Sequence, residues 1–205
     1  MSRPRPLPPR VIVGITGASG AILGIRAVQK LSEIGAEVHL VVSKWGQVTI
    51  AQETPHSVSE VRGMASCWYR DTDQGAAIAS GSFAVDAMVV VPCSTRTAAA
   101  VAGGYGDNLV CRAADVALKE GRPLVLVVRE APLSIIHLRN MLTLAQAGAT
   151  VFPASPSFYP HPKSLDDVVD YLVVRILDQV GLQCESRGRW RGLEAGAGKE
   201  GSRGE

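Results

Sequence analysis

Short apolar runs rich in valine and isoleucine alternate along this chain with longer stretches whose apolar residues recur at helical spacing. Strands are predicted at five of these runs: Val11–Ile15, Glu37–Ser43, Ala87–Pro92, Pro123–Val128 and Ala149–Ala154. The last three are apolar throughout, as expected for strands that are covered on both faces. The alternation of strands with helices is typical of a parallel sheet.

Helical periodicity predicts five helices, at about Gly20–Ile34, from about Lys44 onward, and at Leu109–Lys119, Leu133–Ala147 and Ser164–Val180. The last helix carries a start signal, because Ser164 can cap it and two aspartates follow in its first turn. We therefore expect one doubly wound α/β domain over residues 10–182, with helices on both faces of a parallel sheet.

Both ends of the chain differ from this pattern. Residues 1–9 are too proline-rich and polar for a signal peptide, and we expect them to be disordered. Residues 183–205 are rich in glycine and charge, which predicts a flexible tail. Trp190 in this tail could dock on the domain or on a neighbouring subunit, or could be solvated. No run approaches the roughly 18 apolar residues of a membrane span, so we expect a cytoplasmic protein without membrane contact.

Composition narrows the function further. Of the 205 residues 46% are hydrophobic and 20% charged, which suggests that other subunits cover part of the apolar surface. A net charge of +2 gives no field that would favour nucleic acid. The four cysteines, at 67, 93, 111 and 184, have no CxxC spacing. We therefore expect reduced thiols and neither a metal site nor a disulfide framework.

The stretch "GITGASGAILG", Gly14–Gly24, links the first strand to the first helix and resembles an anion-binding loop. Its glycines fit neither GxGxxG nor the P-loop pattern. Ser43 ends the second strand, where dinucleotide-binding proteins usually carry an acid. The loop thus favours a mononucleotide phosphate, and the alternative is that its glycines serve only tight packing.

Other strand ends carry polar residues to the same edge of the sheet. Arg96 and Arg129 can hold a phosphate, and hydroxyl donors near a predicted helix start are Ser94, Thr95 and Thr97. Glu130 beside Arg129 could donate a proton to a leaving phosphate. The alternative is a structural salt bridge from Glu130 to Arg112 or Lys119.

Two later residues could contact a second anion. Tyr159 lies in "SFYPHP", a loop that its prolines constrain. Arg175 lies on an otherwise apolar helix surface, where an arginine needs a charged partner.

The combination of "GITGASGA", "ASGSFAVDAMVVVPCST", "RAADVALKEGRPLVLVVREAPLSIIHLRNM" and "SFYPHPKSLDDVVDYLVVRILDQ" resembles the UbiX flavin prenyltransferase family over nearly the whole domain. That family includes the B subunits of bacterial hydroxyarylic acid decarboxylase systems. The related flavin-dependent cysteine decarboxylases carry a PASANT-like motif where this chain has "PCSTRT". The resemblance implies a Rossmann-like or flavodoxin-like fold and a homo-oligomer, commonly a dodecamer.

The resemblance also implies an activity: metal-independent transfer of the dimethylallyl group of dimethylallyl phosphate to N5 and C6 of reduced FMN. The prenylated FMN would serve a UbiD-type decarboxylase. By motif, the FMN contacts would be Gly17, Ala18, Ser19, Ser43, Ser94, Thr95, Arg96, Thr97 and Arg129. The prenyl phosphate would meet Arg112, Lys119, Arg129, Glu130, Tyr159 and Arg175, with Lys119 and Arg175 reaching across subunit boundaries.

Three residues, Ser19, Glu53 and Glu130, would move protons in the reaction that the resemblance implies. A different class of function stays open beside it. The chain could be an accessory subunit that binds and delivers FMN without catalysis. The sequence favours the enzyme, because a carrier does not need Glu130, Tyr159 and Arg175 around a second phosphate.

Overall fold

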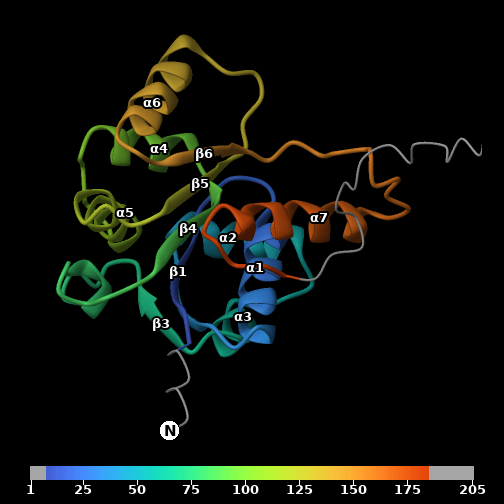
Figure 1. The fold of residues 1–205 in the computed structure, drawn as a ribbon, viewed down its shortest axis with the longest axis horizontal. Coiled ribbons are helices and arrows are strands. Elements are labelled where there is room, and N and C mark those ends of the chain that lie inside the picture. The colour runs from blue at the N-terminus through green and yellow to red at the C-terminus, as the bar shows by residue number, and fades with distance from the viewer. Residues whose placement is uncertain (1–7, 185–205) are drawn as a thin grey trace, which may run out of the picture.

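The computed structural model describes residues 8–184, which form a six-stranded sheet with every neighbouring pair of strands parallel. The strand order is β3-β2-β1-β4-β5-β6, so β1 and β4 are neighbours at the centre of the sheet (Figure 1). The strands span β1 Arg10–Ile15, β2 Glu37–Val42, β3 Cys67–Arg70, β4 Ala87–Cys93, β5 Leu124–Val128 and β6 Thr150–Pro153. The five predicted strands and their parallel arrangement are confirmed.

Helices connect these strands on both faces of the sheet (Figure 1). They span α1 Ala21–Glu33, α2 Lys44–Glu53, α3 Val58–Gly63, α4 Thr95–Ala102, α5 Leu109–Lys119, α6 Ile135–Gln146 and α7 Leu165–Asp178, with a short 3₁₀ turn, η1, at Ala77–Ala79. The five predicted helices are confirmed, and each predicted end lies within two residues of the observed one. Ser164 caps α7 as predicted, because its hydroxyl accepts a hydrogen bond from the Asp167 N–H.

The apolar pattern did not predict β3, α3 or α4 as complete elements. β3 is an edge strand of sequence "CWYR" that pairs only with β2, and none of its side chains is fully buried. An edge strand of this kind needs no continuous apolar run. α3 is held by a capping box in which Ser57 and Glu60 bond each other's main-chain N–H groups. The sequence pattern therefore did not show that the end of β3 lies beside the predicted site.

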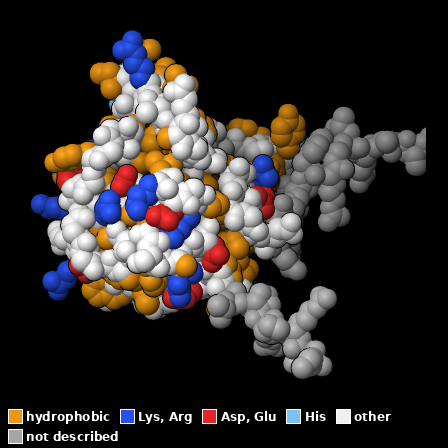
Figure 2. All heavy atoms as spheres, turned by 60° about the vertical axis from the view of Figure 1, so that its left-hand side comes forward, with side chains coloured by type: hydrophobic (Ala, Val, Ile, Leu, Met, Phe, Trp, Pro, Cys, Tyr) orange, Lys and Arg blue, Asp and Glu red, His pale blue; other side chains and the backbone are white. Residues whose placement is uncertain are grey.

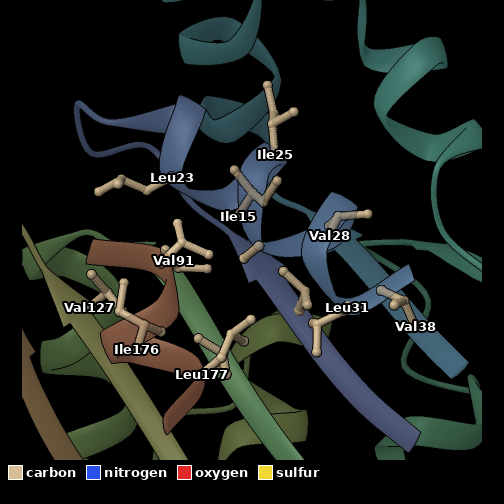
Figure 3. Close-up of a cluster of buried hydrophobic side chains, with 14 of the residues drawn as sticks. Ile15, Leu23, Ile25, Val28, Leu31, Val38, Val91, Val127, Ile176 and Leu177 are labelled. Carbon is tan, nitrogen blue, oxygen red and sulfur yellow. The ribbon is translucent and has the colours of Figure 1, made fainter. Parts of the chain in front are cut away.

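The sheet separates two hydrophobic cores. In one core, Leu31 of α1 and Leu177 of α7 lie over the central strands, as Figure 3 shows. The other core lies beneath α4, α5 and α6 and includes Met88 and Leu126. All residues of β4 and β5 are buried, as the fully apolar runs predicted. The two cores confirm the doubly wound arrangement.

Gly24 allows α1 to approach the sheet closely. A Cβ atom at this position would lie 2.3 Å from the carbonyl oxygen of Val91 and 2.8 Å from Cγ1 of Ile15. Both distances are far shorter than van der Waals contact, so a side chain here would push the helix away from β1 and β4. Since α1 begins at the first loop, its seat on the sheet also positions that loop.

We predict that Gly24→Ala lowers the free energy of unfolding by about 1–3 kcal/mol, because the added methyl group overpacks the contact with Val91. Chemical denaturation measures this change. Gly63→Ala is the matched control, since a Cβ atom at Gly63 meets nothing within 4 Å. Equal stability of the two variants would show that α1 can shift without cost.

Candidate functional site

A pocket of about 780 Å³ lies where the carboxyl ends of five strands meet. The residues that follow these ends are Thr16 after β1, Ser43 after β2, Asp71 after β3, Ser94 after β4 and Arg129 after β5. All of them except the buried Thr16 line the pocket. This volume is in the range of cofactor sites, and this edge is where doubly wound sheets bind ligands.

Ten of the residues singled out from the sequence line this pocket together. They are Gly17, Ala18, Ser19, Ser43, Ser94, Thr95, Arg96, Thr97, Arg129 and Glu130. They come from loops more than 100 residues apart in the chain, and they bring hydroxyls, guanidinium groups and one carboxylate to one cavity. Such a donor set suits an anionic ligand with several polar groups.

The first loop is tied to its neighbours by Thr16 and Gly17. The Thr16 hydroxyl donates to the carbonyl oxygen of Pro92 and accepts from the Ser94 N–H, both at 2.8 Å. A Cβ atom at Gly17 would lie 2.3 Å from Cβ of Trp45, so only glycine fits beneath this side chain. The indole of Trp45 is 60% exposed at the pocket wall. The glycine of the loop thus makes room for Trp45 as well as for a ligand.

Carboxylates close two of the four helix starts around the pocket. Glu53 Oε2 accepts from the N–H groups of Gly20 and Ala21, at 2.8 and 3.1 Å, and so occupies the positive end of α1. These two N–H groups are therefore not free for a phosphate, contrary to what the loop pattern suggested. Asp71 does the same for α5, where its Oδ1 accepts from Val110 N–H at 3.2 Å.

The starts of α2 and α4 stay open. Ser43 and Ser94 cap these helices by accepting from the third N–H group of each, Gly46 and Thr97. Within residues 8–184, no hydrogen bond is made by the N–H groups of the first two residues: Lys44 and Trp45 in α2, Thr95 and Arg96 in α4. All four residues line the pocket. Two helix ends and two cationic side chains therefore face a prospective anion.

The wall near α5 is acidic and apolar instead. Burial raises the pKa of the Asp71 carboxyl and outweighs the hydrogen bond from Val110, and the nearby carboxylate of Asp107 raises it further. Asp107 Oδ2 lies 3.7 Å from a guanidinium nitrogen of Arg96, whose side chain is 79% exposed. Burial also raises the pKa of Cys111 to about 11, so this pocket residue is a neutral thiol near pH 7.

Glu130 does not form the structural salt bridge that the sequence left open. Arg112 pairs with Asp115 and Lys119 pairs with Glu120, each at 2.9 Å. The Glu130 side chain accepts from the N–H of Ala131 and lines the pocket beside Arg129. Within residues 8–184, Glu130 therefore forms no ion pair with Arg112 or Lys119, and its role as a proton donor stays a prediction.

Five predicted residues do not line the pocket: Glu53, Arg112, Lys119, Tyr159 and Arg175. Glu53 lies directly behind it, bonded to the first loop. Lys119 ends α5, about 12 Å along the axis from Cys111, which lines the pocket near the start of that helix. Figure 2 turns the side of α5 and α6 in Figure 1 toward the viewer and shows acidic and basic side chains gathered on that face. Arg175 pairs with Asp178 on α7, and Tyr159 is 75% exposed.

Eight pocket residues were not predicted as site residues from the sequence: Lys44, Trp45, Asp71, Ala100, Tyr105, Asp107, Asn108 and Cys111. The sequence pattern could have indicated only Asn108, because an asparagine just before a predicted helix is a common N-cap. In the structure its side-chain oxygen accepts from the Cys111 N–H.

Over residues 8–184, no group of three or more metal-ligating side chains could hold a metal ion. None of the helices in the same range is long and apolar enough to cross a membrane.

Comparison with known proteins gives a consistent result. The Flavoprotein family matches residues 4–177. A probable UbiX-like flavin prenyltransferase of Escherichia coli O157:H7 is 52% identical over 185 residues, covering 90% of this chain and 94% of that protein. The flavin prenyltransferase UbiX of Thauera aromatica is 49% identical over 185 residues, covering 90% and 95%.

Two solved structures share both fold and sequence with the chain. The crystal structure of AnUbiX in complex with FMN and dimethylallyl pyrophosphate superposes with a TM-score of 0.88 at 47% identity, covering 91% of this chain and all of that one. A dodecameric FMN-dependent UbiX-like decarboxylase from Escherichia coli O157:H7 gives 0.86 at 52% identity, covering 90% and all of it. The cysteine decarboxylase TvaF, at 18% identity and 0.58, shares the fold alone.

Proposed function

The chain belongs to the Flavoprotein family as a UbiX-like flavin prenyltransferase, and we propose that its pocket joins the dimethylallyl group of dimethylallyl phosphate to reduced FMN. The observation that carries this proposal is the convergence of ten motif residues on one pocket at the carboxyl edge of the sheet. The transfer forms bonds at N5 and C6 of the flavin and releases inorganic phosphate. The product would serve a UbiD-type decarboxylase.

The pocket residues fit FMN by their chemistry. The open starts of α2 and α4, with Lys44 and Arg96, can hold the phosphate, and Ser43 and Thr95 add hydroxyl donors. The flavin supplies the nucleophilic ring atoms. Ser19, Arg129 and Glu130 line the remaining wall, where they can contact the ring and the second substrate.

Proton transfer falls to three residues in this proposal. Glu130 lies beside Arg129, so it is in reach of a phosphate that the guanidinium holds and can act as the acid that donates a proton to the leaving group. Glu53 is fixed by two N–H groups of the first loop, and Ser19 precedes them in the same loop. The pair can remove the proton that the flavin loses when the second bond forms.

The second phosphate site is completed by a neighbouring copy in this proposal. Arg112, Lys119 and Arg175 do not line the pocket of their own chain. Lys119 and Arg175 are the two that we expect to reach Glu130 of a neighbouring copy. α6 exposes Ile135, Ile136 and Leu142, which are 58–64% accessible and suit burial against a second copy. A related structure at 52% identity is a dodecamer. We infer the same assembly for a single flavoprotein domain over residues 10–182.

A cytoplasmic location is also part of the proposal. Among the described residues, Cys67, Cys93 and Cys111 are free thiols. Unpaired cysteines are the usual state in a reducing compartment.

One experiment distinguishes an enzyme that transfers the dimethylallyl group from a subunit that only carries FMN. The protein is incubated without oxygen with reduced FMN and dimethylallyl phosphate, and the extracted flavin is weighed by mass spectrometry. The enzyme yields FMN heavier by one five-carbon unit, together with free phosphate. Bound FMN of unchanged mass would instead support the accessory subunit that carries the cofactor.

We predict that Glu130→Gln lowers the single-turnover rate of prenyl transfer about 100-fold or more while FMN stays bound. Glutamine keeps the size of the side chain but cannot donate the proton. Glu33→Gln, at the exposed end of α1, is the control and should react normally. A near-normal rate for Glu130→Gln would return the acid's role to Tyr159 or to solvent.

We predict that Glu53→Gln lowers the rate of prenyl transfer while FMN stays bound. The glutamine Oε1 can still accept from Gly20 and Ala21, so the start of α1 and the affinity for FMN are expected to persist. The transfer rate should fall, because the amide is not a base. Flavin fluorescence titration and single-turnover spectra measure the two quantities. Loss of FMN in parallel with the rate would make Glu53 a structural residue only.

The assembly prediction rests on α6. Ile136→Asp should lower the mass measured by light scattering and with it the transfer rate, because a charge in the first turn opposes burial. The same aspartate is favourable at a helix start, so α6 itself should persist. Ile136→Leu is the matched control and should assemble. A wild-type monomer at micromolar concentration would refute the shared site.

A further inference from the structure

Asp71 is a pocket residue to which the proposed reaction gives no role. It follows β3 directly and lines the pocket on the side of α5. Two bonds fix its position: its carbonyl oxygen accepts from Leu109 N–H at 2.7 Å, and Oδ1 accepts from Val110 N–H at 3.2 Å. The first turn of α5 thus holds this carboxyl group in one place.

The carboxyl group has few hydrogen-bond donors for its degree of burial. A carboxylate can accept about four hydrogen bonds, yet among residues 8–184 the side chain of Asp71 accepts only the one from Val110. No ion pair within 4 Å reaches it in the same range, since Arg96 approaches Asp107 instead. Burial accordingly raises its pKa. A donor from the pocket side would supply what the protein does not.

The chemical groups of this pocket wall limit which hydrogen-bond donors a ligand can present to Asp71. Asp71 and Asp107 both carry carboxyl groups here, so a phosphate is disfavoured by like charge, and the open starts of α2 and α4 offer it a better place. Hydroxyl groups are neutral donors and suit a carboxylate. In related nucleotide-binding sheets an acid after the second strand binds sugar hydroxyls. Here Ser43 occupies that place, and Asp71 supplies an acid one strand further out.

We propose that Asp71 binds the ribityl hydroxyls of the flavin substrate and so sets the position of the ring along the pocket. This inference rests on the proposed function, because it takes FMN as the occupant. The carboxylate accepts from one or two hydroxyls on its pocket side while Val110 holds its other oxygen. The ribityl chain then runs along the α5 wall between the phosphate at the open helix starts and the ring near Ser19 and Glu130.

Three flavins test this placement by fluorescence or absorbance titration in the absence of dimethylallyl phosphate. FMN and riboflavin both carry the ribityl chain, and lumiflavin carries a methyl group in its place. Asp71→Ala should weaken FMN and riboflavin about tenfold each and leave lumiflavin unchanged, because a hydrogen bond to a charged group is lost. Asp71→Asn keeps an oxygen for Val110 and for a hydroxyl, so it should lie between Asp71→Ala and wild type.

Asp73→Asn is the matched control, because Asp73 accepts from Gly75 within its own exposed turn and does not line the pocket. Its three affinities should equal those of the wild type. Equal weakening of all three flavins by Asp71→Ala and by Asp71→Asn would refute the inference and assign Asp71 to the support of α5. Unchanged affinity of Asp71→Ala for FMN and riboflavin would refute it as well. A wild-type protein that binds no flavin would overturn the proposed function and this inference with it, an outcome distinct from the other two.

Discussion

The buried hydroxyl of Thr16 links the two loops on which the site is built. It donates to Pro92 and accepts from Ser94, and so joins the ends of β1 and β4 at the centre of the sheet. Because the side chain is 1% exposed, both bonds are protected from competing water. The first loop on one side and the start of α4 on the other therefore keep a fixed separation, and the pocket residues that follow them are preorganised for a ligand.

Carboxylates decide which helix starts are available. Four helices begin around the pocket, and each has a positive end that could attract an anion. Glu53 and Asp71 neutralise the starts of α1 and α5, whereas Ser43 and Ser94 cap α2 and α4 with neutral hydroxyls. The anion is thus directed to two of the four positions. The remaining walls can present carboxyl groups, which proton transfer requires and a phosphate site does not.

The sequence predicts the site residues that directly follow an apolar strand. It does not predict the contacts between residues that are far apart in the chain. Ser43, Ser94 and Arg129 were predictable as neighbours, because the carboxyl ends of parallel strands share an edge. Asp71 was not, because β3 is an edge strand without an apolar run. The bond from Glu53 to Gly20 joins residues 33 positions apart, and no local pattern encodes it. The fit of Gly17 beneath Trp45 likewise depends on how α2 packs.

The direction of α5 bears on the proposed second phosphate site, because the pocket and Lys119 lie at opposite ends of this helix. α5 contributes its start to the pocket through Asn108 and Cys111. Lys119, at the far end of the helix, does not line the pocket; it pairs with Glu120, which lies against Gly81. In the proposed function, a phosphate held by both Lys119 and Glu130 is therefore bound between copies. Assembly is then a condition for the proposed transfer and not an addition to it.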